Sequence, residues 1–188
     1  RDKHALEQVD KLFSEKREQF FPKALDVLSN EDYSLWLKEI IEKWGRIDIF
    51  IWNISAQSPS WEECFQTDIK ACVVCVEKIL PYLKKSDIPA IVAVASEAAS
   101  RGIPKFKAYA ATKAALIHYM TSLALELVPD KIRVNCVSPS EVYSVDGIWD
   151  KIRYESPERY ERALGRTAWG RMAEPEEVAN AVLFLASP

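Results

Sequence analysis

The chain has 188 residues, of which 48% are hydrophobic and 28% are charged. This length and composition are typical of one folded domain and argue against disorder or a fibrous repeat. The 25 basic and 28 acidic residues give a net charge of -3, without a basic run, so no nucleic-acid partner is expected. The longest apolar stretches are far shorter than the roughly 18 residues that cross a bilayer, so no membrane partner is expected either. The composition therefore favours a small-molecule or protein partner.

Four cysteines, Cys64, Cys72, Cys75 and Cys136, occur in the chain. No secretory pattern opens the sequence, so we expect a reducing, cytoplasmic location and no disulfide framework. Cys72 and Cys75 form a C-x-x-C pattern, but it lies inside the apolar helical stretch 65–80 and no second pair at a zinc spacing follows. We interpret both as core residues and expect no metal site.

Hydrophobic periodicity predicts helices and strands in alternation along most of the chain. The first predicted elements are a surface helix over 3–15 and a short buried strand over 20–27. In chain order, the later ones are a helix over 30–45, a strand over 47–53, a helix over 61–84, a strand over 89–96, a helix over 107–127, a strand over 131–139 and a helix over 174–187. This alternation predicts an α/β fold with a mainly parallel sheet.

A long segment at about 140–170 interrupts the alternation and is rich in Trp, Tyr, Arg and acidic residues. Short helices are predicted within it, around 147–152 and 157–164. Long excursions of this kind are often lids, so we expect a substrate lid within a single domain over 1–188. Its aromatic side chains indicate an apolar substrate pocket or, equally well, a cover for the core.

Polar or turn-forming residues stand at the ends of four predicted strands: Asp26, Asn53, Ser96 and Pro139. Ligands of open parallel sheets bind beyond the carboxyl ends of the strands. We therefore expect these four residues along one edge of one crevice.

The stretch YAATK places Tyr109 and Lys113 four residues apart on a predicted helix, so both project from one face. A neighbouring ammonium favours the phenolate, which makes the phenol a usable acid or base nearer neutral pH. This spacing alone is weak, because a surface tyrosine near a lysine is common. Ser96, at the end of the preceding strand, makes a catalytic site the better interpretation.

Six segments of the chain, in the correct order, resemble the short-chain dehydrogenase/reductase family. They are ALDV (24–27), GRIDIFIWNIS (45–55), AIVAVAS (90–96), YAATK (109–113), IRVNCVSPS (132–140) and GRMAEPEEVANAVLFLAS (170–187). The resemblance implies a Rossmann-like doubly wound parallel sheet, an α/β fold that lacks the first βαβ unit and the last strand within these residues.

The resemblance also implies an NAD(P)-dependent oxidoreductase that interconverts a secondary alcohol and a ketone. Tyr109 would donate a proton to the carbonyl, and Ser96 would hold the carbonyl oxygen. Lys113 would bind the nicotinamide ribose and lower the pKa of Tyr109. The substrate would be a small carbonyl or alcohol compound.

The cofactor implied by the resemblance is NAD or NADP. Besides Tyr109 and Lys113, the positions that would line it are Asp26, at the adenine ring, and Asn53, Pro139, Val142 and Ser144. Ordinary strand-end packing explains the last four equally well. Arg1 is either the remnant of an arginine that selects NADP or a solvated charge, so the choice of cofactor stays open.

The chain departs from the family pattern in its glycine-rich parts. It contains no T-G-x-x-x-G-x-G loop, the N-N-A-G signature retains only Asn53, and Ser140 replaces the glycine that follows the proline. Without the loop, residues 1–188 are expected to bind NAD(P) weakly. Either the loop belongs to a longer chain or the cofactor half-site is lost, and the alternative function is therefore a non-catalytic homologue that acts as a binding or scaffold protein.

A fourth departure is Asp68, which stands where the family has a proton-relaying asparagine. We include Asp68 in the catalytic set, because its charge would offset the pull of Lys113 on Tyr109 and so raise the pKa of the phenol.

Two helical stretches, 61–84 and 107–127, are apolar on most of their faces. Such faces must be covered. We therefore expect a homodimer or homotetramer that forms through these two helices, an arrangement that the family resemblance also implies.

Overall fold

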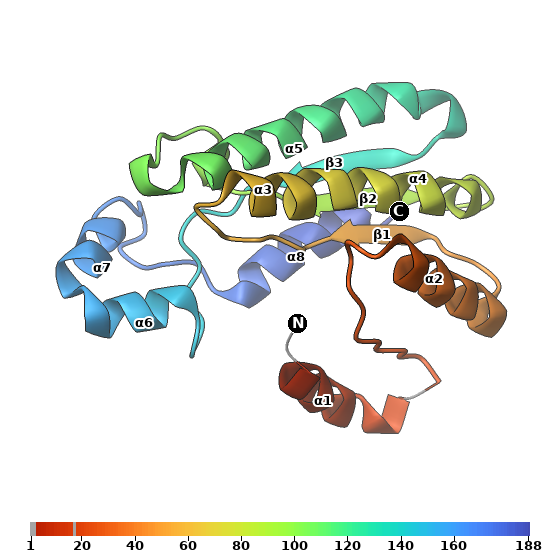
Figure 1. The fold of residues 1–188 in the computed structure, drawn as a ribbon, viewed down its shortest axis with the longest axis horizontal. Coiled ribbons are helices and arrows are strands. Elements are labelled where there is room, and N and C mark those ends of the chain that lie inside the picture. Colours follow the sequence, from red (N-terminus) through yellow and green to blue (C-terminus); the bar gives the residue numbers. More distant parts are fainter. Residues whose placement is uncertain (1–2, 17) are drawn as a thin grey trace.

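The computed structural model describes residues 3–16 and 18–188 (Figure 1). Its helices are α1 (Lys3–Leu12), α2 (Asn30–Trp44), α3 (Trp61–Cys64), α4 (Ala71–Leu83), α5 (Lys107–Glu126), α6 (Ile148–Glu155), α7 (Pro157–Leu164) and α8 (Pro175–Ala186), and its strands are β1 (Ile49–Trp52), β2 (Ala90–Val94) and β3 (Arg133–Val137). A π-helical segment, Phe65–Lys70, joins α3 to α4. Arg1, a candidate for cofactor selection, lies outside the described residues.

The three strands form one parallel sheet in the order β1-β2-β3. The central strand β2 is almost completely buried, because helices cover both of its faces. In Figure 1, α4 and α5 lie on one face of the sheet and α8 lies on the other. This arrangement confirms the predicted doubly wound parallel α/β fold, and it directs the carboxyl ends of all three strands to one edge.

The predicted strand over 20–27 is wrong, because this segment has no regular structure up to a turn at Val27. Among the described residues, β1 pairs only with β2, so the segment has no neighbouring ladder, and Pro22 has no N–H to contribute. Side chains hold it against α2 instead: the Lys23 ammonium lies 2.6 Å from the Glu39 carboxylate. A cavity of about 830 Å³ separates the segment from β1.

Cys72 and Cys75 are core residues, as the sequence predicts. All four are free thiols, and Cys72 and Cys75 of the C-x-x-C pattern are fully buried on α4. Burial raises the pKa of Cys75 to about 11, which keeps that thiol protonated at neutral pH. A buried, protonated thiol is a poor nucleophile and a poor metal ligand.

The two long helical stretches pack on the sheet through one face each. Leu116 and Met120 of α5 are buried, whereas the outer surface of the first stretch exposes Trp61 and Phe65, by 60% and 53%. None of the helices in the described part of the chain is long and apolar enough to cross a membrane.

Candidate active site

Backbone pairing continues past the ends of β2 and β3 and sets the position of Ser96. The Ala95 N–H donates to the Val137 carbonyl at 2.8 Å, and the Glu97 N–H donates to the Pro139 carbonyl at 2.9 Å. Ser96 therefore lies beside the end of β3. Its hydroxyl accepts a hydrogen bond from the Ala98 N–H at 3.1 Å, which fixes the side chain at the start of a short helical turn.

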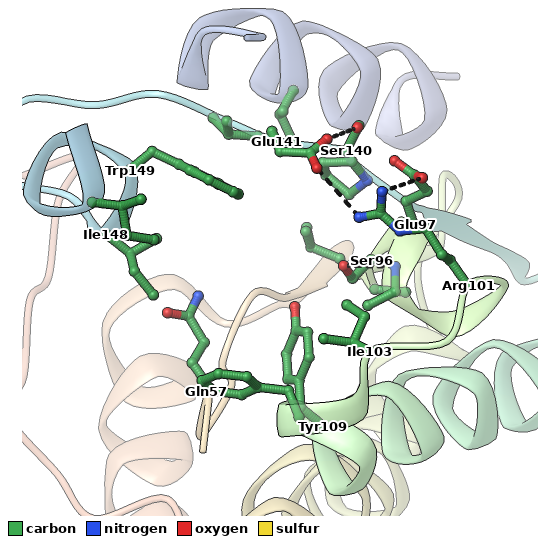
Figure 2. A pocket seen from close by; sticks show the side chains of 18 of the residues that line it. Gln57, Ser96, Glu97, Arg101, Ile103, Tyr109, Ser140, Glu141, Ile148 and Trp149 are labelled. Atoms are coloured by element: carbon green, nitrogen blue, oxygen red, sulfur yellow. Dashed lines mark hydrogen bonds and ion pairs between the residues drawn. The ribbon is translucent and has the colours of Figure 1, made fainter. Parts of the chain in front are cut away.

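Tyr109, in the first turn of α5, directs its hydroxyl toward Ser96 and into a cavity (Figure 2). Burial raises the pKa of Tyr109 above its ordinary value of 10.0, the hydrogen bond with Ser96 lowers it, and the negative charge of Asp68 raises it again. The resulting pKa is higher than the ordinary value, which is the direction expected from Asp68 and the opposite of the lowering expected from Lys113. Desolvation is the largest cause of this rise.

Lys113 and Asp68 form a buried ion pair behind Tyr109. The ammonium lies 3.1 Å from the Asp68 carboxylate, and their side chains are 2% and 0% exposed. Lys113 also donates to the Val94 carbonyl at 3.2 Å. The charge of Lys113 is therefore balanced by Asp68 inside the fold.

The Asp68 carboxylate also contacts the loop that follows β1. The Ser55 hydroxyl donates to Asp68 at 2.5 Å, and the Ala56 N–H donates to its other oxygen at 3.1 Å. Asp68 belongs to the π-helical segment Phe65–Lys70, a rare backbone form that is often found at functional sites. Asp68 thus ties the loop after β1 to α5 through Lys113.

A cavity of about 410 Å³ lies at the carboxyl ends of the strands, and we call it the catalytic cavity. Five residues singled out in the sequence line it: Asn53, Ser96, Tyr109, Pro139 and Val142. Its volume falls in the usual range of small-molecule sites. The carboxyl ends of the parallel strands share one edge of the sheet, so residues that are far apart in the sequence meet at this cavity.

Four other singled-out residues lie outside the catalytic cavity. Lys113 and Asp68 are buried behind its wall, and Ser144 is exposed and lines neither cavity. Asp26 lines the second cavity, the one of about 830 Å³ next to β1.

Several charged residues that sequence analysis missed line the catalytic cavity: Glu97, Arg101, Glu141 and Arg159. Of these, Glu141 is almost completely buried. It accepts hydrogen bonds from Ser140, from Arg101 at 3.2 Å and from Arg166 at 2.5 Å. Burial by itself would raise the pKa of Glu141, but these hydrogen bonds outweigh burial and lower it to about 2. A signal was present in the sequence, because Glu141 lies two residues beyond the end of a predicted strand.

The interpretation of the lid aromatics as pocket residues holds for Trp149 alone. Its indole projects into the catalytic cavity opposite Tyr109 (Figure 2). Trp169 and Tyr154, by contrast, are exposed and lie outside the cavity, and Tyr143 donates its hydroxyl to Asp150 at 2.8 Å.

The two cavities fit an elongated ligand with chemically different ends. Asn53 lines both of them, while Asp26 lies at one and Tyr109 at the other. A dinucleotide has this shape, and Asp26 supplies a hydrogen-bond acceptor at the far end. The residues present therefore suit the two ends of a nicotinamide dinucleotide at the strand ends, the position that open parallel sheets use for such ligands, whereas residues 1–188 contain no glycine-rich loop for its pyrophosphate.

The site and the fold agree with a family assignment from comparison with known proteins. A family model described as "Enoyl-(Acyl carrier protein) reductase" matches residues 1–188. The chain therefore belongs to the short-chain dehydrogenase/reductase family.

Two curated relatives and one solved structure illustrate this relationship. Isoepoxydon dehydrogenase of Penicillium expansum is 34% identical over 173 residues, which cover 88% of this chain and 66% of the relative. The 3-oxoacyl-[acyl-carrier-protein] reductase FabG of Thermotoga maritima is 30% identical over 177 residues, 88% of this chain and 69% of the relative. A structure of 7α-hydroxysteroid dehydrogenase complexed with NADH and 7-oxo glycochenodeoxycholic acid has a TM-score of 0.88 at 25% identity, and the match covers 98% of this chain and 74% of that one. This chain thus spans about two thirds of the length of the first relative.

Proposed function

We propose that the protein is an NAD(P)-dependent oxidoreductase that interconverts a secondary alcohol and a ketone, with Tyr109 as the general acid and base. One observation carries the proposal: the hydroxyls of Tyr109 and Ser96 meet in a cavity at the carboxyl ends of parallel strands. Two donors at one point suit a carbonyl oxygen that gains negative charge during reduction. The relatives, a dehydrogenase and a 3-oxoacyl reductase, support carbonyl chemistry.

In the direction of reduction, the carbonyl oxygen accepts hydrogen bonds from Ser96 and Tyr109. A nicotinamide held by these residues would supply the hydride that the carbonyl carbon requires. Tyr109 then transfers its proton to the developing alkoxide, and in oxidation the phenolate accepts it back. The raised pKa of Tyr109 favours the protonated form at neutral pH, so the free side chain is poised for reduction.

The remaining site residues hold the cofactor or the catalytic groups. In this proposal Lys113 contacts the nicotinamide ribose, Asp26 contacts the adenine, and Asn53, Pro139 and Val142 line the cofactor site. Ser144, which lines neither cavity, would contact the cofactor from outside them. Asp68 orients Lys113 through their ion pair, and Ser55 in turn holds Asp68 through a hydrogen bond. Residues 140–170 serve as the substrate lid, because Trp149 from this segment lines the catalytic cavity. A reducing, cytoplasmic location is part of the proposal, and the four free thiols are consistent with it.

Replacement of Tyr109 by phenylalanine tests the proposal, because it deletes the acid and preserves the ring. We expect reduction of a panel of ketones by the full chain, with NADH or NADPH, to fall by about 10²–10⁴-fold. Tyr119→Phe is the matched control, since Tyr119 lies on the same helix and lines neither cavity. Full activity in the Tyr109→Phe variant would contradict the role of Tyr109. Absence of any turnover in the unsubstituted protein, with the fold intact, would support the non-catalytic alternative instead.

A further inference from the structure

The charged groups of the catalytic cavity form a network that is neutral except for one side chain. Glu141 binds Arg101 and Arg166, and Arg101 also lies 3.6 Å from Glu97. Two carboxylates and two guanidiniums thus neutralise one another (Figure 2 shows the part formed by Glu97, Arg101 and Glu141).

Arg159, on α7, is the remaining charged residue that lines the cavity. Within residues 3–16 and 18–188, no carboxylate lies at ion-pair distance from it. Its guanidinium instead lies 5.8 Å from the centre of the Trp149 ring. A cation–π contact of this kind leaves the N–H groups of the guanidinium available to an acceptor.

Apolar side chains also line the catalytic cavity, and one of them, Trp149, is the ring that Arg159 contacts. Ile148 and Trp149 face the cavity from α6, and Ile103 faces it from the Tyr109 side (Figure 2). A ligand in the cavity would therefore meet two hydroxyls, apolar side chains and a guanidinium without an ion-pair partner among the described residues.

We propose, on the basis of the proposed carbonyl chemistry, that the substrate carries a carboxylate and that Arg159 binds it. The substrate class is then an oxo acid, or the corresponding hydroxy acid, with an apolar spacer between the two functional groups. A guanidinium fork matches the two oxygens of a carboxylate, and the other arginines near the cavity are already engaged with Glu141. The carboxylate would give the exposed Arg159 guanidinium the ion-pair partner that it lacks among the described residues.

Paired acids and esters test the proposal, since esterification removes the charge and retains the ketone. The probes are levulinate, para-acetylbenzoate and para-acetylphenylpropionate, each compared with its methyl ester in steady-state reduction by the full chain. We expect a lower KM for at least one acid than for its ester, and we expect Arg159→Gln to raise the KM of that acid by about 10-fold to 100-fold. The KM of the ester should change little, and Arg159→Lys should restore part of the loss.

Arg162→Gln is the matched control, because Arg162 lies on the same helix, carries the same charge and does not line the catalytic cavity. Equal KM values for every acid and its ester, or equal effects of the Arg159 and Arg162 substitutions on the acid, would overturn the carboxylate subsite and leave the reductase proposal intact. Failure to reduce any acid or ester would overturn the reductase proposal, and the subsite with it.

Discussion

Glu141→Gln is the substitution that most directly tests how the loops of the catalytic cavity are held together. Glutamine has nearly the shape of glutamate, but it carries no charge. The change keeps the side chain in place while weakening its hydrogen bonds to Arg101 and Arg166, which come from two different segments of the chain. The buried side chain at position 141 would then no longer offset the charges of the two partly exposed guanidiniums.

The pKa of Glu141 gives the magnitude of this effect. In the folded protein it falls from 4.5 to about 2, so the carboxylate stabilises the fold at any pH above about 4.5 and loses this contribution as the pH falls toward about 2. At about 1.4 kcal/mol per pKa unit, the upper limit is about 3 kcal/mol. Because Arg101 and Arg166 are 35% and 47% exposed, solvent screening reduces the expected loss to about 2 kcal/mol.

Thermal unfolding followed by tryptophan fluorescence measures the loss. At neutral pH, Glu141→Gln should lower the Tm by about 4–8 °C, given about 2–4 °C per kcal/mol for a chain of this size. The difference between the variant and the unsubstituted protein should shrink as the pH is lowered from about 4.5 toward about 2, because the native Glu141 then becomes neutral too.

Glu177→Gln provides the comparison. Glu177 also has a pKa of about 2, but its partner Arg171 is a single exposed side chain. This control should lower the Tm much less. Equal Tm losses for the two variants, or a loss at Glu141 that persists unchanged down to pH 2, would refute the assignment of the effect to the buried charge.

Two further outcomes concern the ion pair and the assembly. Asp68→Asn removes a negative charge that raises the pKa of Tyr109, so in the full chain alcohol oxidation should be faster at neutral pH and its pH–rate profile should move to lower pH; an unchanged profile would show that Asp68 does not act on the phenol. The exposed Trp61 and Phe65 side chains should be covered in a dimer or tetramer, so light scattering should give a multiple of the monomer mass. Phe65→Asp should shift that mass toward the monomer. A monomeric mass for the unsubstituted protein would contradict the expected interface.

The sequence determines those parts of the fold that depend on local pattern. The strands over 47–53, 89–96 and 131–139 are short apolar runs flanked by helices, and the structure contains a parallel strand within each of them. Tyr109 and Lys113 could be paired from their spacing alone, since helical geometry fixes their common face. The position of Ser96 in the site could be predicted because ligands of open parallel sheets bind beyond the carboxyl ends of the strands.

Only the tertiary structure decides what depends on contacts between distant segments. The stretch 20–27 has a strand-like composition but no adjacent ladder, so it forms no strand. The pKa of Tyr109 is raised, and not lowered as the spacing to Lys113 suggests, because burial of the phenol and the nearby charge of Asp68 outweigh the hydrogen bond with Ser96. Likewise, the sequence does not show that Glu141 pairs with Arg101 and Arg166 while Arg159 contacts an aromatic ring instead. These side chains come from separate segments, and no local pattern records which of them meet in the folded chain.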